Sequence, residues 1–214
     1  MPRWTATARP SYAGAHWQVG ECPIAAIERL RALLDYTPSP GTPEGPWLET
    51  ERLILRPQDI VADLEASAQT YADADTMRYL SGSPLSRAQS WRTLALQIGH
   101  HHVRGYSFLA CIDKATGAWV GRVGPWYPEG WPAPEIGWAL HPDHRGRGYA
   151  TEAARACLDH VRGELGWTSL VHVIADGNVG SVGVAERLGS TRLYAIDGIP
   201  GVSDMPCHVY GQDL

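Results

Sequence analysis

The sequence predicts a mixed α/β fold in which helices cover both faces of a central mixed β-sheet. One observation is the order of the expected elements: a strand, helices, three strands, a helix, a strand, a helix and two closing strands. A second is a strongly amphipathic segment at 149–165, where apolar residues recur every three or four positions. A third is size, because 214 residues that are 44% hydrophobic can bury a sizeable core.

The first half of this pattern is a strand, helices and a group of three strands. The stretch ERLILRP at 51–57 predicts a short alternating strand, and two helical segments are expected within 59–80. Apolar residues at helical spacing predict another helix within 83–102. The segment 106–124 predicts a hairpin around the turn KATG, and APEIGWALHP at 133–142 predicts the third strand of the group.

The second half begins with the amphipathic helix at 149–165. The short apolar run SLVHVIAD at 169–176 predicts a buried strand. A short helix that ends at a glycine is expected at 178–189, and closing strands are expected at 191–196 and 207–214. This alternation of helices and strands is typical of an α/β protein whose sheet is covered by helices.

Residues 1–47 are expected to be an appendage of a main domain at 48–214. A loose apolar pattern in the appendage predicts one short helix, with the residues Ile24, Ile27, Leu30 and Leu34. It is followed by YTPSPGTPEGPW, whose prolines cannot continue a helix and indicate an extended connector. The appendage is expected to pack on the main domain or to be partly mobile.

Charge and cysteine content exclude several classes of protein. The formal net charge is -5, which argues against a general nucleic-acid binder. The stretch MPRWTATARPSYAGAHW has no apolar core, and no run of 18 apolar residues occurs, so neither a signal peptide nor a membrane partner is expected. Wide cysteine spacing without CxxC predicts reduced thiols in a cytosolic protein, at Cys22, Cys111, Cys157 and Cys207.

A cationic, glycine-containing loop stands directly before the amphipathic helix, in HPDHRGRGYATEAARACLDHV at 141–161. The first amides of a helix lack intrahelical partners, and the helix dipole adds positive potential there. Glycines let successive N–H groups converge on one anion. The plain alternative is that the glycines only shape a turn while the arginines are solvated. We favour a phosphate or pyrophosphate site because the loop follows an apolar strand and opens a strong helix.

The same residues resemble the acetyl-coenzyme A binding segment of the GNAT N-acetyltransferases, whose signature is [QR]-x-x-G-x-[GA]. Arg145, Gly148 and Ala150 fill the signature positions. The stretches ETERLILRP, DADTMRYL and NVGSVGVAERLGS resemble the RimJ/RimL-like branch of that family. The resemblance covers about residues 48–212 and implies a GNAT-like sheet and an acetyltransferase activity.

The resemblance implies acetyl-CoA as co-substrate and no metal. The loop backbone would bind the pyrophosphate, from Arg145, Gly146, Arg147, Gly148, Tyr149 and Ala150. The preceding strand would pair with the pantetheine arm through Trp138, Ala139 and Leu140. Asn178 would reach the same arm, although the spacing N-V-G-S equally allows Asn178 to cap the following helix.

The implied reaction is acetyl transfer to a primary amine by direct attack in a ternary complex, the acceptor being a protein N-terminal α-amine or a small-molecule amine. Glu135, on the strand before the loop, is the candidate base, and its alternative is an ordinary strand-end acid facing solvent. Ala185 stands where many relatives carry a catalytic tyrosine. In the RimL-like branch this implies Ser181 as donor to the leaving sulfur, with a first-turn serine at a helix start as the alternative.

Three aromatic residues in GPWYPEGWPAP are expected in a loop, where they would form a wall of the acceptor pocket or cover the sheet edge: Trp126, Tyr127 and Trp131. The histidines at 100–102 are expected to be solvated near a helix C-terminus rather than to bind metal. The competing function is a non-catalytic acyl-CoA-binding sensor. Oligomeric state stays open, with a homodimer as the commonest default.

Overall fold

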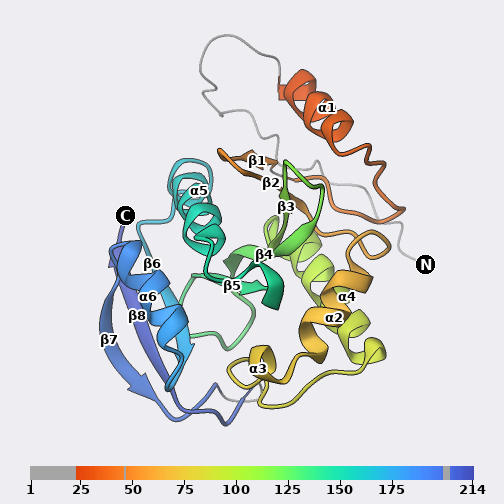
Figure 1. Cartoon of the computed structure of the whole chain (residues 1–214). Helices are drawn as coiled ribbons and strands as arrows, with labels where there is room; N and C mark the ends of the chain where they lie inside the picture. The colour runs from red at the N-terminus through yellow and green to blue at the C-terminus, as the bar shows by residue number, and fades with distance from the viewer. Residues whose placement is uncertain (1–22, 46, 200–202) are drawn as a thin grey trace, which may run out of the picture.

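The structure is a computed structural model that describes residues 23–45, 47–199 and 203–214 (Figure 1). Within these residues one eight-stranded sheet has the order β1-β2-β3-β4-β5-β6-β8-β7. The strands are β1 (Leu48–Glu49), β2 (Leu53–Pro57), β3 (Leu109–Asp113), β4 (Trp119–Trp126), β5 (Glu135–Leu140), β6 (Ser169–Ala175), β7 (Thr191–Ile196) and β8 (Cys207–Asp213). The helices are α1 (Pro23–Leu33), α2 (Leu64–Ala72), α3 (Ala74–Met77), α4 (Arg87–Arg104), α5 (Tyr149–Gly163) and α6 (Val179–Arg187), with a 3-10 turn at Pro142–His144.

Neighbouring residues of β4 show that helices cover both faces of the sheet. Val123 is fully buried in the core that also contains Ala153 and Ala154 of α5. The adjacent Arg122 points the other way, because successive strand residues face opposite sides, and its Nε donates to the Tyr71 hydroxyl of α2 at 2.7 Å. Figure 1 places α5 and α2 on opposite sides of the central strands. The predicted fold class, a mixed sheet with helices on both faces, is confirmed.

The sheet is nearly split between β5 and β6. This pair is parallel and has one residue pair in register, Glu135 with Val171, whereas the other neighbouring pairs are antiparallel. Beyond it, side chains replace the ladder: the His172 ring nitrogen Nδ1 donates to the Ile136 carbonyl at 2.6 Å. The Val173 N–H donates to Glu135 Oε1 at 3.1 Å. The two strands therefore diverge toward their carboxyl ends and leave a wedge.

Two details of the predicted strands were wrong. The first strand was expected to alternate between buried and exposed residues, but all five residues of β2 are buried, because the sheet is covered on both faces. β4 also runs on to Trp126, which pairs with Glu135 and is buried, so Trp126 belongs to the sheet and not to a loop. The Pro/Gly-rich sequence predicted a loop at Trp126, but Pro125 is accommodated within strand β4.

The described part of the predicted appendage packs on the domain. Asp59 Oδ2 accepts three hydrogen bonds from this segment: from the Tyr36 hydroxyl at 2.8 Å, the Ser39 N–H at 2.7 Å and the Thr42 hydroxyl at 2.7 Å. Burial of Asp59 favours the protonated form, but these donors and the bonded backbone N–H of Ala62 outweigh it and lower the pKa of Asp59. Residues 1–22, including the predicted thiol Cys22, lie outside the described residues, whereas Cys111, Cys157 and Cys207 are free thiols.

Two of the three adjacent histidines on α4 are buried, so the expectation of a solvated cluster was wrong. His100 Nδ1 contacts the Tyr106 carbonyl at 2.8 Å, and His101 Nε2 contacts the Glu44 carbonyl at 2.9 Å. Burial lowers the pKa of both imidazoles. Their role is therefore to join α4 to neighbouring segments.

Candidate active site

The glycine loop before α5 has the conformation that its sequence requires. Gly146 has φ +74 and Gly148 has φ +82, both in the left-handed region that only glycine adopts without strain. Gly148 is the N-cap residue of α5 and has no side chain to satisfy the first amides of the helix. No side chain of the N-cap residue therefore occupies those N–H groups, which leaves them open to an anion.

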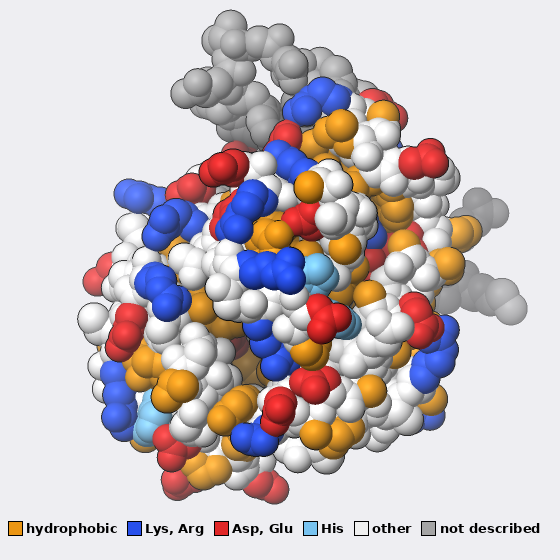
Figure 2. Space-filling view, viewed as in Figure 1, with side chains coloured by type: hydrophobic (Ala, Val, Ile, Leu, Met, Phe, Trp, Pro, Cys, Tyr) orange, Lys and Arg blue, Asp and Glu red, His pale blue; other side chains and the backbone are white. Residues whose placement is uncertain are grey.

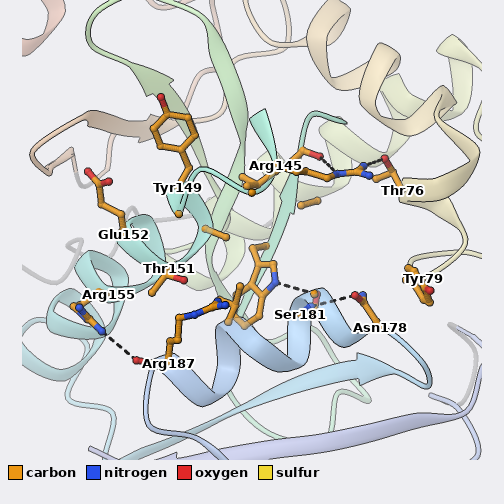
Figure 3. A pocket seen from close by; sticks show the side chains of 18 of the residues that line it. Thr76, Tyr79, Arg145, Tyr149, Thr151, Glu152, Arg155, Asn178, Ser181 and Arg187 are labelled. Carbon is orange, nitrogen blue, oxygen red and sulfur yellow. Dashed lines mark hydrogen bonds between the residues drawn. The ribbon is translucent and has the colours of Figure 1, made fainter. Parts of the chain in front are cut away.

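A cleft of about 1450 Å³ opens at this helix start, and Figure 2 shows its mouth as a hollow with Lys and Arg side chains around it. Nine of the ten predicted cofactor residues line the cleft: Trp138, Ala139, Leu140, Arg145, Gly146, Gly148, Tyr149, Ala150 and Asn178. Arg147 does not line it. The long cleft runs from the glycine loop along the diverging strand β5 to the start of α6 (Figure 3).

The Arg145 side chain binds residues at the start of α3. Its guanidinium donates to the Thr76 hydroxyl (Figure 3). It also donates, at 3.3 Å, to the Asp73 carboxylate that caps α3. The same carboxylate accepts from the Thr76 N–H at 2.7 Å. The signature arginine thus links the glycine loop to the short helix on the opposite wall of the cleft.

Arg52 and Glu152 brace the glycine loop, and sequence reasoning missed both. The Arg52 guanidinium forms an ion pair of 2.6 Å with Glu152, in the first turn of α5. Glu152 also accepts from the Arg52 N–H at 2.9 Å and from the Thr50 hydroxyl at 2.5 Å, and these bonds lower its pKa although partial burial opposes them. Arg52 Nη1 donates to the Arg147 carbonyl at 2.9 Å. Arg147 therefore stabilises the glycine loop through its backbone carbonyl, which accepts the bond from Arg52.

The Tyr149 ring anchors the helix start and turns away from the cleft floor (Figure 3). Its hydroxyl donates to Asp113 Oδ2 at 2.5 Å, and the Arg52 guanidinium lies 4.5 Å from the ring centroid. Further cations lie along the cleft: Arg155 and Arg187 both line it, and Arg155 Nη2 donates to the Arg187 carbonyl at 3.1 Å. No local pattern in the sequence distinguishes these arginines from solvated ones.

Ser181 and Asn178 meet at the start of α6. Asn178 is the N-cap residue and its Oδ1 accepts from the Ser181 N–H at 3.1 Å, while both side chains line the cleft. Both alternatives for Asn178, the helix cap and the cleft position, are compatible with this arrangement. The Ser181 hydroxyl oxygen accepts from the Trp138 indole N–H at 3.1 Å, which joins α6 to β5 across the wedge.

Glu135 is buried at the narrow end of the wedge and is not a solvent-facing acid. Its Oε1 accepts from the Val173 N–H at 3.1 Å, and its Oε2 accepts from the Trp131 indole N–H. Burial raises the pKa of Glu135 to about 7, although these two donors and the charge of Arg122 oppose the rise. Glu135 is not among the residues that line the cleft. Glu135 is the first residue of β5, the strand whose later residues Trp138, Ala139 and Leu140 line the cleft.

The three predicted acceptor-wall aromatics do not line this cleft. Trp126 is buried between Phe108, at a ring distance of 4.9 Å, and His100, at 4.3 Å. Tyr127 and Trp131 are half-buried, and Trp131 supports Glu135. Among the described residues, no cluster of three His, Cys, Asp or Glu side chains is arranged to hold a metal ion, and none of the helices is long and apolar enough to span a membrane.

This chain is similar to known proteins in sequence. The family model described as an acetyltransferase (GNAT) domain matches residues 52–191. The uncharacterized protein YkkB of Bacillus subtilis is 33% identical over 147 residues, which is 66% of this chain and 83% of YkkB.

Solved structures of acetyltransferases are similar to this chain in fold. An acetyltransferase from Agrobacterium tumefaciens is 31% identical, with a TM-score of 0.68 over 79% of this chain and 95% of that one. RimL, a ribosomal L7/L12 alpha-N-protein acetyltransferase in complex with coenzyme A, is 19% identical with a TM-score of 0.64 over 79% and 98% of the two chains. An identity of 19% shows a shared fold between RimL and this chain, and nothing more specific.

Proposed function

We propose, from the premise that this chain belongs to the GNAT acetyltransferase family, that it moves the acetyl group of acetyl-CoA to a primary amine. Acetyl-CoA-dependent acyl transfer is the general activity of the family. The single observation that carries the proposal is the cleft, in which an anion-binding glycine loop, a diverging strand and the start of α6 follow one another. The likeness to RimL supports a protein N-terminal α-amine, and a small-molecule amine is the other acceptor class.

The residues present fit acetyl-CoA. The loop amides and the N-terminus of α5 would bind the pyrophosphate, and Arg155 and Arg187 would add positive charge along the same wall. Trp138, Ala139 and Leu140 would face the pantetheine, because within the described residues β5 beyond Glu135 has no strand partner on its β6 side. An unpaired strand edge offers backbone donors and acceptors to an extended amide chain.

The reaction requires a neutral amine. Its nitrogen lone pair attacks the thioester carbonyl carbon, the carbon–sulfur bond breaks, and the electron pair leaves on sulfur. The attacking nitrogen loses one proton to a base. The leaving thiol has a pKa of about 8.5, so the departing sulfur needs a hydrogen-bond donor more than a strong acid.

Glu135 is the proposed base, acting through water. Support comes from its place at the end of the β5–β6 pair and from a pKa raised to about 7 by burial. An acid with that pKa can take a proton near neutral pH and release it again. Ser181 is the proposed donor to sulfur, supported by its position on the cleft wall.

The test is release of free thiol from acetyl-CoA over a panel of peptides and small amines. Amine-dependent release with a matching acetylated product supports the proposal and identifies the acceptor class. Tight binding of acetyl-CoA with no transfer to any amine would instead favour the acyl-CoA sensor.

A further inference from the structure

The Ser181 hydroxyl is held by an indole N–H. Trp138 Nε1 donates to Ser181 Oγ at 3.1 Å, and both residues line the cleft (Figure 3 shows this bond at Ser181). The two residues lie on separate elements: Trp138 is on β5 and Ser181 is in the first turn of α6. The bond therefore spans the wedge along which the co-substrate would lie.

Hydroxyls in helices commonly donate back to the carbonyl four residues earlier. Ser90 does so in this protein, with its Oγ 3.1 Å from the Ser86 carbonyl, and Thr93 does so toward the Gln89 carbonyl, also at 3.1 Å. Within the described part of the chain, Ser181 Oγ has no such acceptor and has Trp138 as its side-chain partner. An indole N–H can only donate, so Ser181 Oγ must be the acceptor in this bond.

The orientation of the hydroxyl proton follows from that assignment. One lone pair of Ser181 Oγ faces the indole, and the O–H must therefore point away from it. Asn178 Oδ1 accepts the Ser181 backbone N–H at 3.1 Å, and among the described residues the Ser181 hydroxyl makes no hydrogen bond to that oxygen. The O–H is left to donate to a group in the cleft.

Trp138 is itself held in place. Its ring lies 4.9 Å from the His172 ring, tilted by 51°. His172 Nδ1 is fixed by the Ile136 carbonyl at 2.6 Å, and burial lowers the pKa of His172 to about 4. His172 is therefore a neutral packing surface at physiological pH, and it keeps the indole from rotating away from α6.

We propose that Trp138 is a positioning residue: its indole N–H occupies the acceptor side of the Ser181 hydroxyl and so directs the Ser181 O–H at the thioester sulfur. This inference rests on the proposed function. When the carbon–sulfur bond breaks, the electron pair stays on sulfur and the Ser181 O–H hydrogen-bonds to it. A hydroxyl that accepts one hydrogen bond donates the next more strongly, so the indole also strengthens this contact. The proton lost by the amine goes to the base and then to solvent, which also supplies the thiol proton.

The experiment is a double-mutant cycle on the full chain. Trp138→Phe keeps an aromatic ring against His172 and removes the N–H. It should lower kcat roughly tenfold while the Kd for acetyl-CoA changes less than about twofold. Ser181→Ala should lower kcat by a similar factor. The Ser181→Ala variant that also carries Trp138→Phe should be no slower than Ser181→Ala alone. Trp91→Phe, on the exposed surface of α4, is the matched control and should leave kcat unchanged.

A second replacement at position 138 separates loss of the N–H from loss of packing. Benzothienylalanine at position 138 keeps the bicyclic ring and replaces the N–H by sulfur, so packing on His172 is retained. It should give the same loss in kcat as Trp138→Phe with an unchanged melting temperature.

Three outcomes would overturn the inference. If Trp138→Phe slows the Ser181→Ala enzyme as much as it slows the wild type, Trp138 does not act through Ser181. If benzothienylalanine leaves kcat unchanged, the N–H is irrelevant. If Ser181→Ala retains full kcat in an enzyme that still acetylates amines, the Ser181 assignment fails while the acetyltransferase function stands. Failure of the function itself is distinct, because the wild type would then acetylate no amine.

Discussion

The backbone N–H of Val173 donates to Glu135 Oε1 at 3.1 Å, across the point where β5 and β6 separate. In a regular parallel ladder that N–H would have a backbone carbonyl as its partner. Here a carboxylate takes the place of the carbonyl, so the two strands can diverge without leaving a buried N–H unsatisfied. Burial of the carboxyl group at this point raises the pKa of Glu135 to about 7, although the hydrogen bond from the Val173 N–H opposes that rise.

We expect Glu135→Gln to lower kcat by ~10²–10⁴-fold if this residue is the general base. The wild-type kcat should rise with pH through about 7, because the carboxylate form is the active one and burial raises the pKa of Glu135 to about 7. The variant should lose that inflection and recover activity at high pH, where the amine loses its own proton. Steady-state kinetics against pH with a peptide α-amine and a lysine-like amine measure this. A small loss that is equal at all pH values for both amines would leave Glu135 with a structural role.

Glu135 should also make the stability of the fold depend on pH. Its pKa is about 7 in the folded chain and 4.5 ordinarily, so the unfolded chain loses this proton first as pH rises. The contribution is fully present below about 4.5 and is lost as pH rises through about 7, by up to about 3 kcal/mol. Urea unfolding at several pH values should show this fall in the wild type and its absence in Glu135→Gln. Equal slopes for the two proteins would contradict the raised pKa.

Gly148→Glu should abolish acetyl-CoA binding. The new carboxylate would stand at the helix start that binds the pyrophosphate, and a side chain at φ +82 is strained. Its Cβ would lie 3.5 Å from Arg52 Nη2, so the carboxylate would also compete for that cation. Gly166→Glu is the matched control, because Gly166 has φ +66 and open space around it. Calorimetry should show binding in the control and none in Gly148→Glu, and unchanged affinity in a folded Gly148→Glu protein would exclude the loop as the anion site.

A chain that begins at Trp47 should bind acetyl-CoA normally but unfold more easily. Among the described residues, those that line the cleft start at Thr50, so the cleft would stay intact. Asp59 Oδ2 would lose its three partners from the deleted segment. Because part of this carboxylate can be rehydrated, we expect a loss of about 1–3 kcal/mol in the free energy of unfolding.

The control keeps the full chain and removes two of the three bonds, in Tyr36→Phe combined with Thr42→Val. It should reproduce part of the destabilisation with an unchanged Kd for acetyl-CoA. A folded truncated protein that no longer binds acetyl-CoA would show that the N-terminal segment completes the site.

The sequence alone was sufficient for the features that neighbouring residues encode. The periodicity of the segment at 149–165 predicted α5, which spans Tyr149–Gly163, and the glycines at 146 and 148 indicated a bend of the chain at its start. Both are local, because a helix and its cap are determined within a few residues of chain. The order of the strands and helices also followed from local periodicity, and with it the fold class.

Tertiary structure alone decided which side chains meet. Arg52 and Glu152 are 100 residues apart in the chain, and no local pattern pairs them; β2 and the start of α5 bring them together. The sequence left open whether Glu135 is a base or a solvent-facing acid, because its exposure depends on how far β5 pairs with β6, which is a property of the sheet. Periodicity reports how a residue sits relative to its own strand or helix, whereas contact and burial depend on register and on what covers each face, and those are determined only when the whole sheet has assembled.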